Sequence, residues 1–325
     1  MTRAPRAREA GVTLVELMVG CVVLGILASA ALGTTVIFAR SFSVHQRMVK
    51  VLRAGRISVE LVTDALRNAS PGVPTGSIGD LAGCTTPGPL AVTQGQDGPD
   101  SLEVVHAVGG VVTTLRQPYA ADSTLLTVVD GSRFAAGDLA VVSDLGTGGH
   151  VVRITRVAQS GSEWRLTTSA PSACPAVSFP AEGYSPGALV IRARLSRFSI
   201  GDFLGLPTLM VDGDGDGPDE AEPLAEGIED LQVAVGVDVD GDGRLTDTGD
   251  SADEWFGNDP SDSAPPASPR AVRVTLVARA TLPENGAPSF RRPAVEDHAA
   301  GAQEDNYRRR VLSSTVEIRN LEGSP

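Results

Sequence analysis

The residues from Gly11 to Phe38 form a near-continuous apolar run in which Glu16 is the only charged side chain. A helix rises about 1.5 Å per residue, so a run of this length can cross the roughly 30 Å hydrocarbon core of a bilayer. A short basic leader with Arg3, Arg6 and Arg8 comes before it. The run therefore predicts a membrane-spanning helix near the N-terminus, to which every later element must be joined.

The carboxylate of Glu16 needs a compensating partner. An acidic residue costs about 2.5–3.5 kcal/mol in the middle of a membrane helix and less near its end. If the chain is cut after Gly11, Val12 becomes the first residue and Glu16 lies one turn into the helix. There the carboxylate meets the positive end of the helix dipole and a free N-terminal ammonium, its own or a neighbour's.

The segment from Gly11 to Leu17, GVTLVEL, together with the basic leader, resembles the processing site of type IV prepilins. The resemblance implies that a prepilin peptidase cuts after Gly11 and that Glu16 is a register-setting contact during assembly. The usual first mature residue in that family is Phe, and here it is Val12.

Two other interpretations of the N-terminus remain open. A secretory signal peptide would have a basic region, an apolar region and a cleavage site at Ala28-Ser29-Ala30. An ordinary single-pass anchor would have the same apolar run. Neither interpretation gives Glu16 a role, so the prepilin-type interpretation is preferred.

An amphipathic helical pattern follows the apolar run. Apolar residues recur at steps of three and four from Val44 to Leu66, with charged residues largely on the other faces. Pro71, Gly72 and Pro74 end the pattern. The predicted organisation is a leader over 1–11, a transmembrane helix over 12–38, its amphipathic continuation over 39–69 and a head over 70–325.

The head is predicted to consist mainly of antiparallel β-sheet. Short β-branched segments separated by turn residues recur from Ser101 onward, which is typical of all-β structure. A β-subdomain is expected as an insertion near 101–185. The predicted fold class is α+β, with a long N-terminal helix followed by the β head, and we expect strands at 102–105, 111–115, 125–129, 139–142, 151–157, 164–168, 189–200, 209–211, 231–237, 271–280 and 310–319.

Four further segments resemble parts of PilW-type minor pilins. Residues 54–69 resemble the end of the long helix, 224–238 the segment before the sheet, and 271–279 and 310–316 the last two strands. The resemblance implies a pilin-like fold and assembly with other minor and major pilins through the N-terminal helix. It also implies a role in priming the filament as part of a tip complex with a tip adhesin. The precursor would be held in the bacterial inner membrane with its head in the periplasm, and the assembled protein would lie in the pilus at the cell surface.

The charge balance argues against nucleic acid as a partner. The chain has 40 acidic and 27 basic residues, a net charge of −13, and no basic patch. Cys84 and Cys174 lie in loops of the part placed outside the cytoplasm, where a disulfide between them is expected, although two unpaired thiols remain the alternative.

Two Asp/Gly loops are candidate Ca²⁺ sites. The first has Asp212, Asp214 and Asp216, with Glu220 at the ninth position, and the second has Asp238, Asp240 and Asp242. Alternating Asp residues place three carboxylates around one point, as Ca²⁺ requires, whereas the alternative is a solvated turn. Position twelve holds Pro223 in the first loop and Gly249 in the second, so a full EF-hand is not expected.

The sequence is not expected to encode an enzyme, because it shows no HExxH, GxSxG or phosphate-binding loop. The predicted function is that of a minor pilin in type IV pilus assembly. The alternatives are a pseudopilin of a type II secretion system and a calcium-binding surface adhesin with a plain signal anchor.

Overall fold

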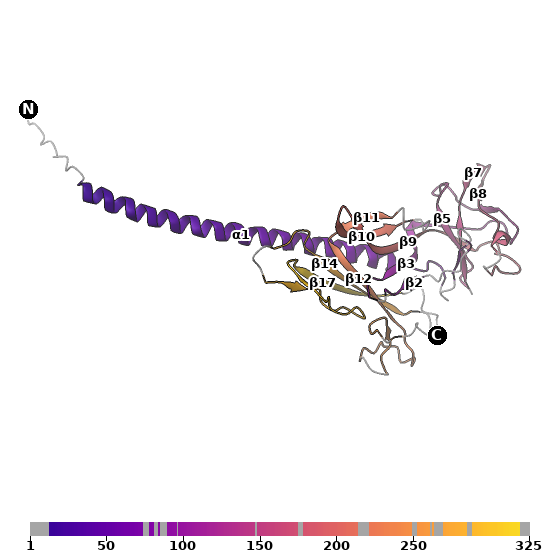
Figure 1. Cartoon of the computed structure of the whole chain (residues 1–325). Helices are drawn as coiled ribbons and strands as arrows, with labels where there is room; N and C mark the ends of the chain where they lie inside the picture. The colour runs from indigo at the N-terminus through magenta and orange to yellow at the C-terminus, as the bar shows by residue number, and fades with distance from the viewer. Residues whose placement is uncertain are drawn as a thin grey trace, which may run out of the picture. The chain divides into compact units, whose positions relative to one another are not determined.

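The structure of the chain, a computed structural model, is shown in Figure 1. It describes residues 13–73, 78–80, 84, 90–95, 97–146, 148–174, 178–213, 221–248, 252–260, 262, 269–284 and 288–318. The chain divides into two compact units, Met1–Val49 and Lys50–Pro325.

One helix, α1, runs from Leu14 to Arg67. In the first unit its Leu14–Thr35 part has a mean hydropathy of 2.3 and is long and apolar enough to cross a membrane. Its large apolar side chains are open to solvent, with Leu14 74% and Leu24 70% exposed. An apolar surface of this extent requires lipid or other apolar helices around it.

In the second unit, the last turns of α1 form part of the protein core. Val62, Ala65 and Leu66 are buried, and the backbone at Gly55 approaches the sheet so closely that an added methyl group would overlap Leu312. The helix ends at Arg67, and Ser70 then takes a positive φ of 51° as the chain turns. The predicted alternation of apolar and charged residues thus buries one face of the helix.

The larger sheet has eight strands among the described residues, in the order β1-β6-β5-β9-β10-β11, with β3 paired to β9 and β2 to β3. All of its pairs are antiparallel except β1 with β6. The strands are β1 (Ile78–Asp80), β2 (Leu90–Thr93), β3 (Ser101–Thr114), β5 (Leu139–Ser143), β6 (Gly149–Arg153), β9 (Leu189–Phe203), β10 (Leu206–Asp212) and β11 (Glu222–Glu226).

A second antiparallel sheet, of four strands in the described ranges, has the order β13-β12-β14-β17. Figure 1 shows β12, β14 and β17 beside one another in the C-terminal half of the head. The strands are β12 (Ile228–Gly236), β13 (Trp255–Phe256), β14 (Ala271–Arg279) and β17 (Arg309–Glu317). A methyl group added at Gly55 would meet Leu312 and Ala278, which places this part of α1 against this sheet. On its outer side β17 pairs with no other described strand.

A smaller body within the head has its own core. It includes a three-stranded antiparallel sheet of β4 (Leu125–Val128), β8 (Glu163–Thr167) and β7 (Arg156–Ser160). Its buried core residues lie between Val111 and Val190 and include Tyr119, Leu126 and Leu166. The remaining elements are a 3₁₀ turn, η1 (Pro171–Ala173), and the short pair β15 (Phe290–Arg291) and β16 (Glu304–Asp305).

The strand predictions were wrong in two places. The segments 102–105 and 111–115, expected as two strands, belong to the single strand β3, because Gly109 and Gly110 have positive φ and form a bulge within it. The segment 151–157, expected as one strand, is divided at Ile154 between β6 and β7, which belong to different sheets.

A buried polar cluster joins the centre of β12 to two loops. The two carboxylate oxygens of Asp100 accept hydrogen bonds from the amides of Gly95 and Val233 at 2.9 and 2.8 Å. Asp230, which is fully buried, is paired with Arg292 and His298 at 2.8 Å each. These contacts satisfy charges that would otherwise destabilise a β-sheet core.

We predict that the ionisation of Asp100 makes the stability of the head depend on pH. Burial raises the pKa of Asp100 to about 7, although the amides of Gly95 and Val233 favour the charged form. In the unfolded chain the pKa is about 3.9, so between these values only the folded state binds the proton. The free energy of unfolding should therefore fall as the pH rises from about 5 to about 7.

Denaturant unfolding of the full chain in detergent at several pH values measures this effect. Asp100→Asn removes the titrating group. The free energy of unfolding of the wild type minus that of the variant should therefore fall as the pH rises across that range. Asp122→Asn, on an exposed turn, is the matched control. Parallel curves for wild type and Asp100→Asn would contradict the prediction.

Candidate functional site

The start of α1 is a capping box that includes Glu16. Thr13 donates its backbone N–H and its hydroxyl to Glu16 Oε2, at 2.9 Å each, and the Glu16 amide donates back to the Thr13 hydroxyl at 3.3 Å. These bonds satisfy helix amides that have no partner within the helix. The predicted processing residues Gly11 and Val12 lie outside the described residues.

The capping box leaves one oxygen of Glu16 open. Oε1 accepts no hydrogen bond from any described residue, whereas Oε2 accepts two from Thr13. The carboxylate is exposed at the first turn of the helix, where the helix dipole favours a negative charge. The arrangement can therefore take a further donor, such as an ammonium group, without breaking the cap.

Only part of the first Asp/Gly loop can be placed. Asp212, at the end of β10, is buried. Asp214, Asp216 and Glu220 lie outside the described residues, so the candidate site formed by these four residues stays a prediction.

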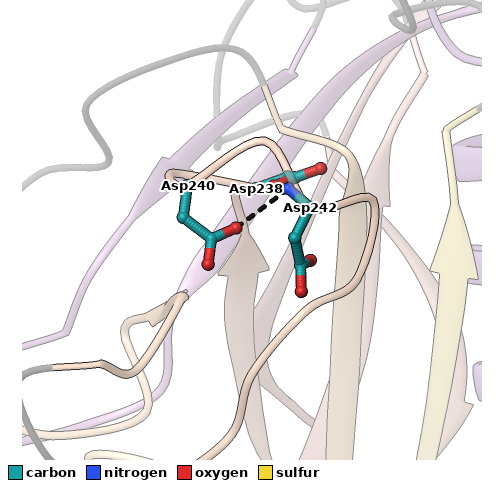
Figure 2. A group of neighbouring side chains, drawn as sticks. All are labelled: Asp238, Asp240 and Asp242. Carbon is teal, nitrogen blue, oxygen red and sulfur yellow. Dashed lines mark hydrogen bonds between the residues drawn. The ribbon is translucent and has the colours of Figure 1, made fainter.

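The second loop brings Asp238, Asp240 and Asp242 together after the end of β12. One oxygen from each carboxylate lies within 4.8 Å of the others. The same carboxylates also form the turn, because Asp242 donates its amide to Asp240 at 2.9 Å, as Figure 2 shows, and Gly241 donates to Asp238 at 2.8 Å. The loop geometry predicted from the spacing is thus maintained by hydrogen bonds to backbone amides.

Two residues that sequence reasoning missed support this loop. Arg270 makes a 2.8 Å ion pair with Asp238 Oδ2. The buried Glu254 accepts the amides of Val239 at 2.7 Å and Thr246 at 2.9 Å. The hydrogen bonds from the amides of Thr246 and Val239 hold the pKa of Glu254 below its ordinary value. The loop is therefore ordered by groups that lie outside the Asp/Gly pattern.

The residues of the second loop fit Ca²⁺ only in part. Asp240 and Asp242 each have an oxygen that accepts no hydrogen bond within the described ranges, but both oxygens of Asp238 are engaged. Since Ca²⁺ takes six to eight oxygen ligands, an ion here would have to displace Arg270 and recruit water. Calcium binding at this loop stays a prediction.

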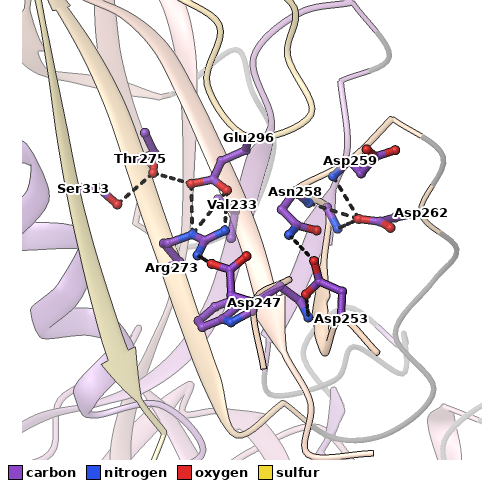
Figure 3. Close-up of polar contacts among 12 residues, drawn as sticks. Val233, Asp247, Asp253, Asn258, Asp259, Asp262, Arg273, Thr275, Glu296 and Ser313 are labelled. Carbon is purple, nitrogen blue, oxygen red and sulfur yellow. Dashed lines mark hydrogen bonds and ion pairs between the residues drawn. The ribbon is translucent and has the colours of Figure 1, made fainter. Parts of the chain in front are cut away.

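A second polar cluster crosses β14 near this loop (Figure 3). Arg273 lies between Glu296, at 2.8 Å, and Asp247, at 2.6 Å, and its guanidinium stacks over Trp255. Thr275 extends the cluster by donating to Glu296 at 2.7 Å. Asp247, which follows the second Asp/Gly loop, is thus an arginine partner in this structure.

Cys84 and Cys174 form a disulfide with a Cα–Cα distance of 4.9 Å. The bond links the segment after α1 to the smaller body of the head, because Cys174 belongs to that body's buried core. Of the three cysteines, Cys21 in α1 is free.

We predict that Ca²⁺ raises the melting temperature of the full chain in detergent by about 2–4 °C at millimolar concentration, relative to chelator. Asp242→Asn should remove this response, because it takes away a ligand and leaves the ion pair of Asp238 intact. Arg270→Gln should enlarge it by removing the cation that competes with Ca²⁺ for Asp238 Oδ2. A melting curve that Ca²⁺ does not move in wild type or in Arg270→Gln would exclude the site.

Comparison with known proteins identifies both ends of the chain. Residues 197–320 match the family model of type IV pilus-assembly protein W, and residues 6–32 match the prokaryotic N-terminal methylation motif. Neither description names a catalytic activity. No curated protein matches the chain significantly.

Among solved structures, a type IV-like pilin from Thermus thermophilus is similar, with 17% identity and a TM-score of 0.23 over 57% of this chain and 85% of that one. The two family matches cover the helix start that contains the Thr13–Glu16 cap and the sheet against which the end of α1 packs. The N-terminal methylation motif and the PilW match support the role of a PilW-like minor pilin in type IV pilus assembly.

Proposed function

We propose that this minor pilin is cut after Gly11, enters the filament through α1 and primes assembly as part of a tip complex. The observation that carries the proposal is the position and hydrogen bonding of the Glu16 carboxylate. Its carboxylate lies at the start of an exposed apolar helix, is positioned by Thr13 and keeps one oxygen open. Such a group is suited to receive the N-terminal ammonium of a processed pilin.

The energetics favour insertion among other helices once that ammonium is present. An unpaired carboxylate near the end of a membrane helix is costly, and the Thr13 cap reduces this cost only in part. An ammonium partner adds a charged hydrogen bond in a medium of low dielectric constant. The exposed apolar side chains along Leu14–Thr35 would then pack against the helices of neighbouring pilins.

The proposed orientation places the leader in the cytoplasm and the head in the periplasm before assembly. Arg3, Arg6 and Arg8 lie before the apolar helix, and short positively charged segments stay on the cytoplasmic side. The disulfide between Cys84 and Cys174 is expected to form in an oxidising compartment. The proposed partners are prepilin peptidase, other minor and major pilins, and a tip adhesin.

We predict that Glu16→Ala lowers the number of surface filaments by about tenfold or more, since one charged hydrogen bond is worth about 1.5–3 kcal/mol. Counting filaments and twitching cells, with immunoblots to show that the precursor is still made, measures the effect. Glu60→Ala, on the exposed face of the same helix, is the matched control. Filaments at wild-type level in Glu16→Ala would refute the assembly role of the carboxylate.

N-terminal sequencing of the mature protein tests the processing step separately. We expect the mature chain to start at Val12, whereas a start at Ala31 would indicate a secreted protein with a signal peptide. Loss of protein secretion with normal twitching, in cells that lack the chain, would instead indicate a secretion pseudopilin.

A further inference from the structure

The turn between β9 and β10 has an unusual residue at its tip. Phe203 and Leu206 are paired, so Leu204 and Gly205 form a two-residue hairpin loop, and both have positive φ, 54° and 79°. A loop of this type favours Asn followed by Gly, because the left-handed conformation is strained for a side chain such as leucine. Leu204 therefore occupies a position where a smaller polar residue would be more stable.

Leu204 is also the most exposed large apolar side chain in the part of the chain that the structure describes. It is 84% exposed, more than any such residue of the membrane-spanning part of α1, where Leu14 reaches 74%. Phe203, Leu206 and Pro207 are half-buried beside it. A strained backbone and a largely exposed apolar side chain at one position together indicate a contact that is absent from the isolated chain.

The tip is held in place by its surroundings. β9 pairs with β3, β5 and β10, and β10 pairs with β11 on its other side. The carboxylate of Asp202 accepts the amide of Gly205 at 2.9 Å, and the Pro207 carbonyl accepts the amide of Gly227 at 2.7 Å. An apolar side chain on a fixed backbone loses less conformational entropy on binding than one on a mobile loop, which suits an interface anchor residue.

The charges near the tip define the kind of surface that fits it. Asp202 is exposed within the hairpin, and Glu226, paired with Thr208 across the next strand, is exposed as well. These carboxylates disfavour an anionic lipid surface and also a second copy of this chain, whose net charge is −13. They favour a protein surface that carries Lys or Arg.

We propose that Leu204 is an anchor that inserts into an apolar recess with a basic rim on another subunit of the same pilus assembly. The inference rests on the proposed function, because it names a contact between the head and a neighbouring subunit in addition to the helix contact of Glu16. In the assembly the recess buries Leu204 while its rim pairs with Asp202 and Glu226.

The substitution Leu204→Asn separates binding from folding, because asparagine relieves the strain of the left-handed conformation. We expect the melting temperature of the purified chain to rise by about 2–4 °C and the amount of the chain in sheared filaments to fall about tenfold. A protein that becomes more stable while its assembly fails identifies Leu204 as a contact residue. Wild-type incorporation of Leu204→Asn would overturn the inference.

Leu145→Asn is the matched control. Leu145 is the other described leucine with positive φ, at 62°, and is 54% exposed in the turn between β5 and β6. Its substitution should relieve comparable strain and leave incorporation unchanged. An equal loss of incorporation in both variants would overturn the inference, because it would show a general sensitivity of the head.

A photo-crosslinking amino acid at position 204, in cells that make filaments, identifies the partner. A crosslink to another pilin subunit at a site next to Lys or Arg supports the proposal, whereas a crosslink to lipid or to a second copy, or no crosslink, overturns it. Glu16→Ala in the same cells separates the two ideas. If Glu16→Ala blocks assembly and Leu204→Asn does not, the helix contact stands and the anchor fails.

Discussion

The hydrogen bonds between Thr13 and Glu16 are the interaction on which the proposed function of this chain depends. They place a carboxylate at the one end of the apolar helix where a negative charge is favoured, and they leave one of its oxygens open. The apolar surface that follows has no partner among the described residues of its own unit, so it requires lipid or other apolar helices around it. In the proposed assembly, the same carboxylate that is costly in lipid becomes favourable among processed pilins.

The head buries the C-terminal part of that helix. Gly55 lets the backbone of α1 approach Leu312 and Ala278, and apolar residues such as Val62 and Leu66 complete the contact. Charged residues on the strands of this sheet are paired: Asp230 on β12 with Arg292, and Arg273 on β14 with Glu296. This sheet therefore packs apolar residues against the helix and binds its neighbouring loops through ion pairs.

Much of this architecture could be predicted from the sequence, because periodicity and composition determine it. The long helix follows from apolar residues at helical spacing, and the β head follows from short β-branched segments. The helix cap could also have been found, because Thr13 and Glu16 have the spacing of a capping box before an apolar run. The alternating spacing of Asp238, Asp240 and Asp242 also predicted that their carboxylates lie together.

The features that could not be predicted depend on contacts between residues distant in sequence, or on residues that occupy locally unfavourable backbone conformations. Arg270 and Glu254 meet the Asp238 loop only through the fold, so no spacing rule indicates them. Gly109 and Gly110 have the composition of a turn but form a bulge within one strand. The hairpin at Leu204 lacks the usual Asn-Gly signal, because leucine occupies the strained position.

The outer edge of β17 has a consequence for the isolated protein. The strand is nine residues long, with charged residues only at its ends, and its stretch from Val311 to Val316 contains no proline and no charge. Val311 is 46% exposed along it. The unpaired middle of such an edge strand favours edge-to-edge association between molecules, unless a neighbouring molecule or an introduced lysine covers it.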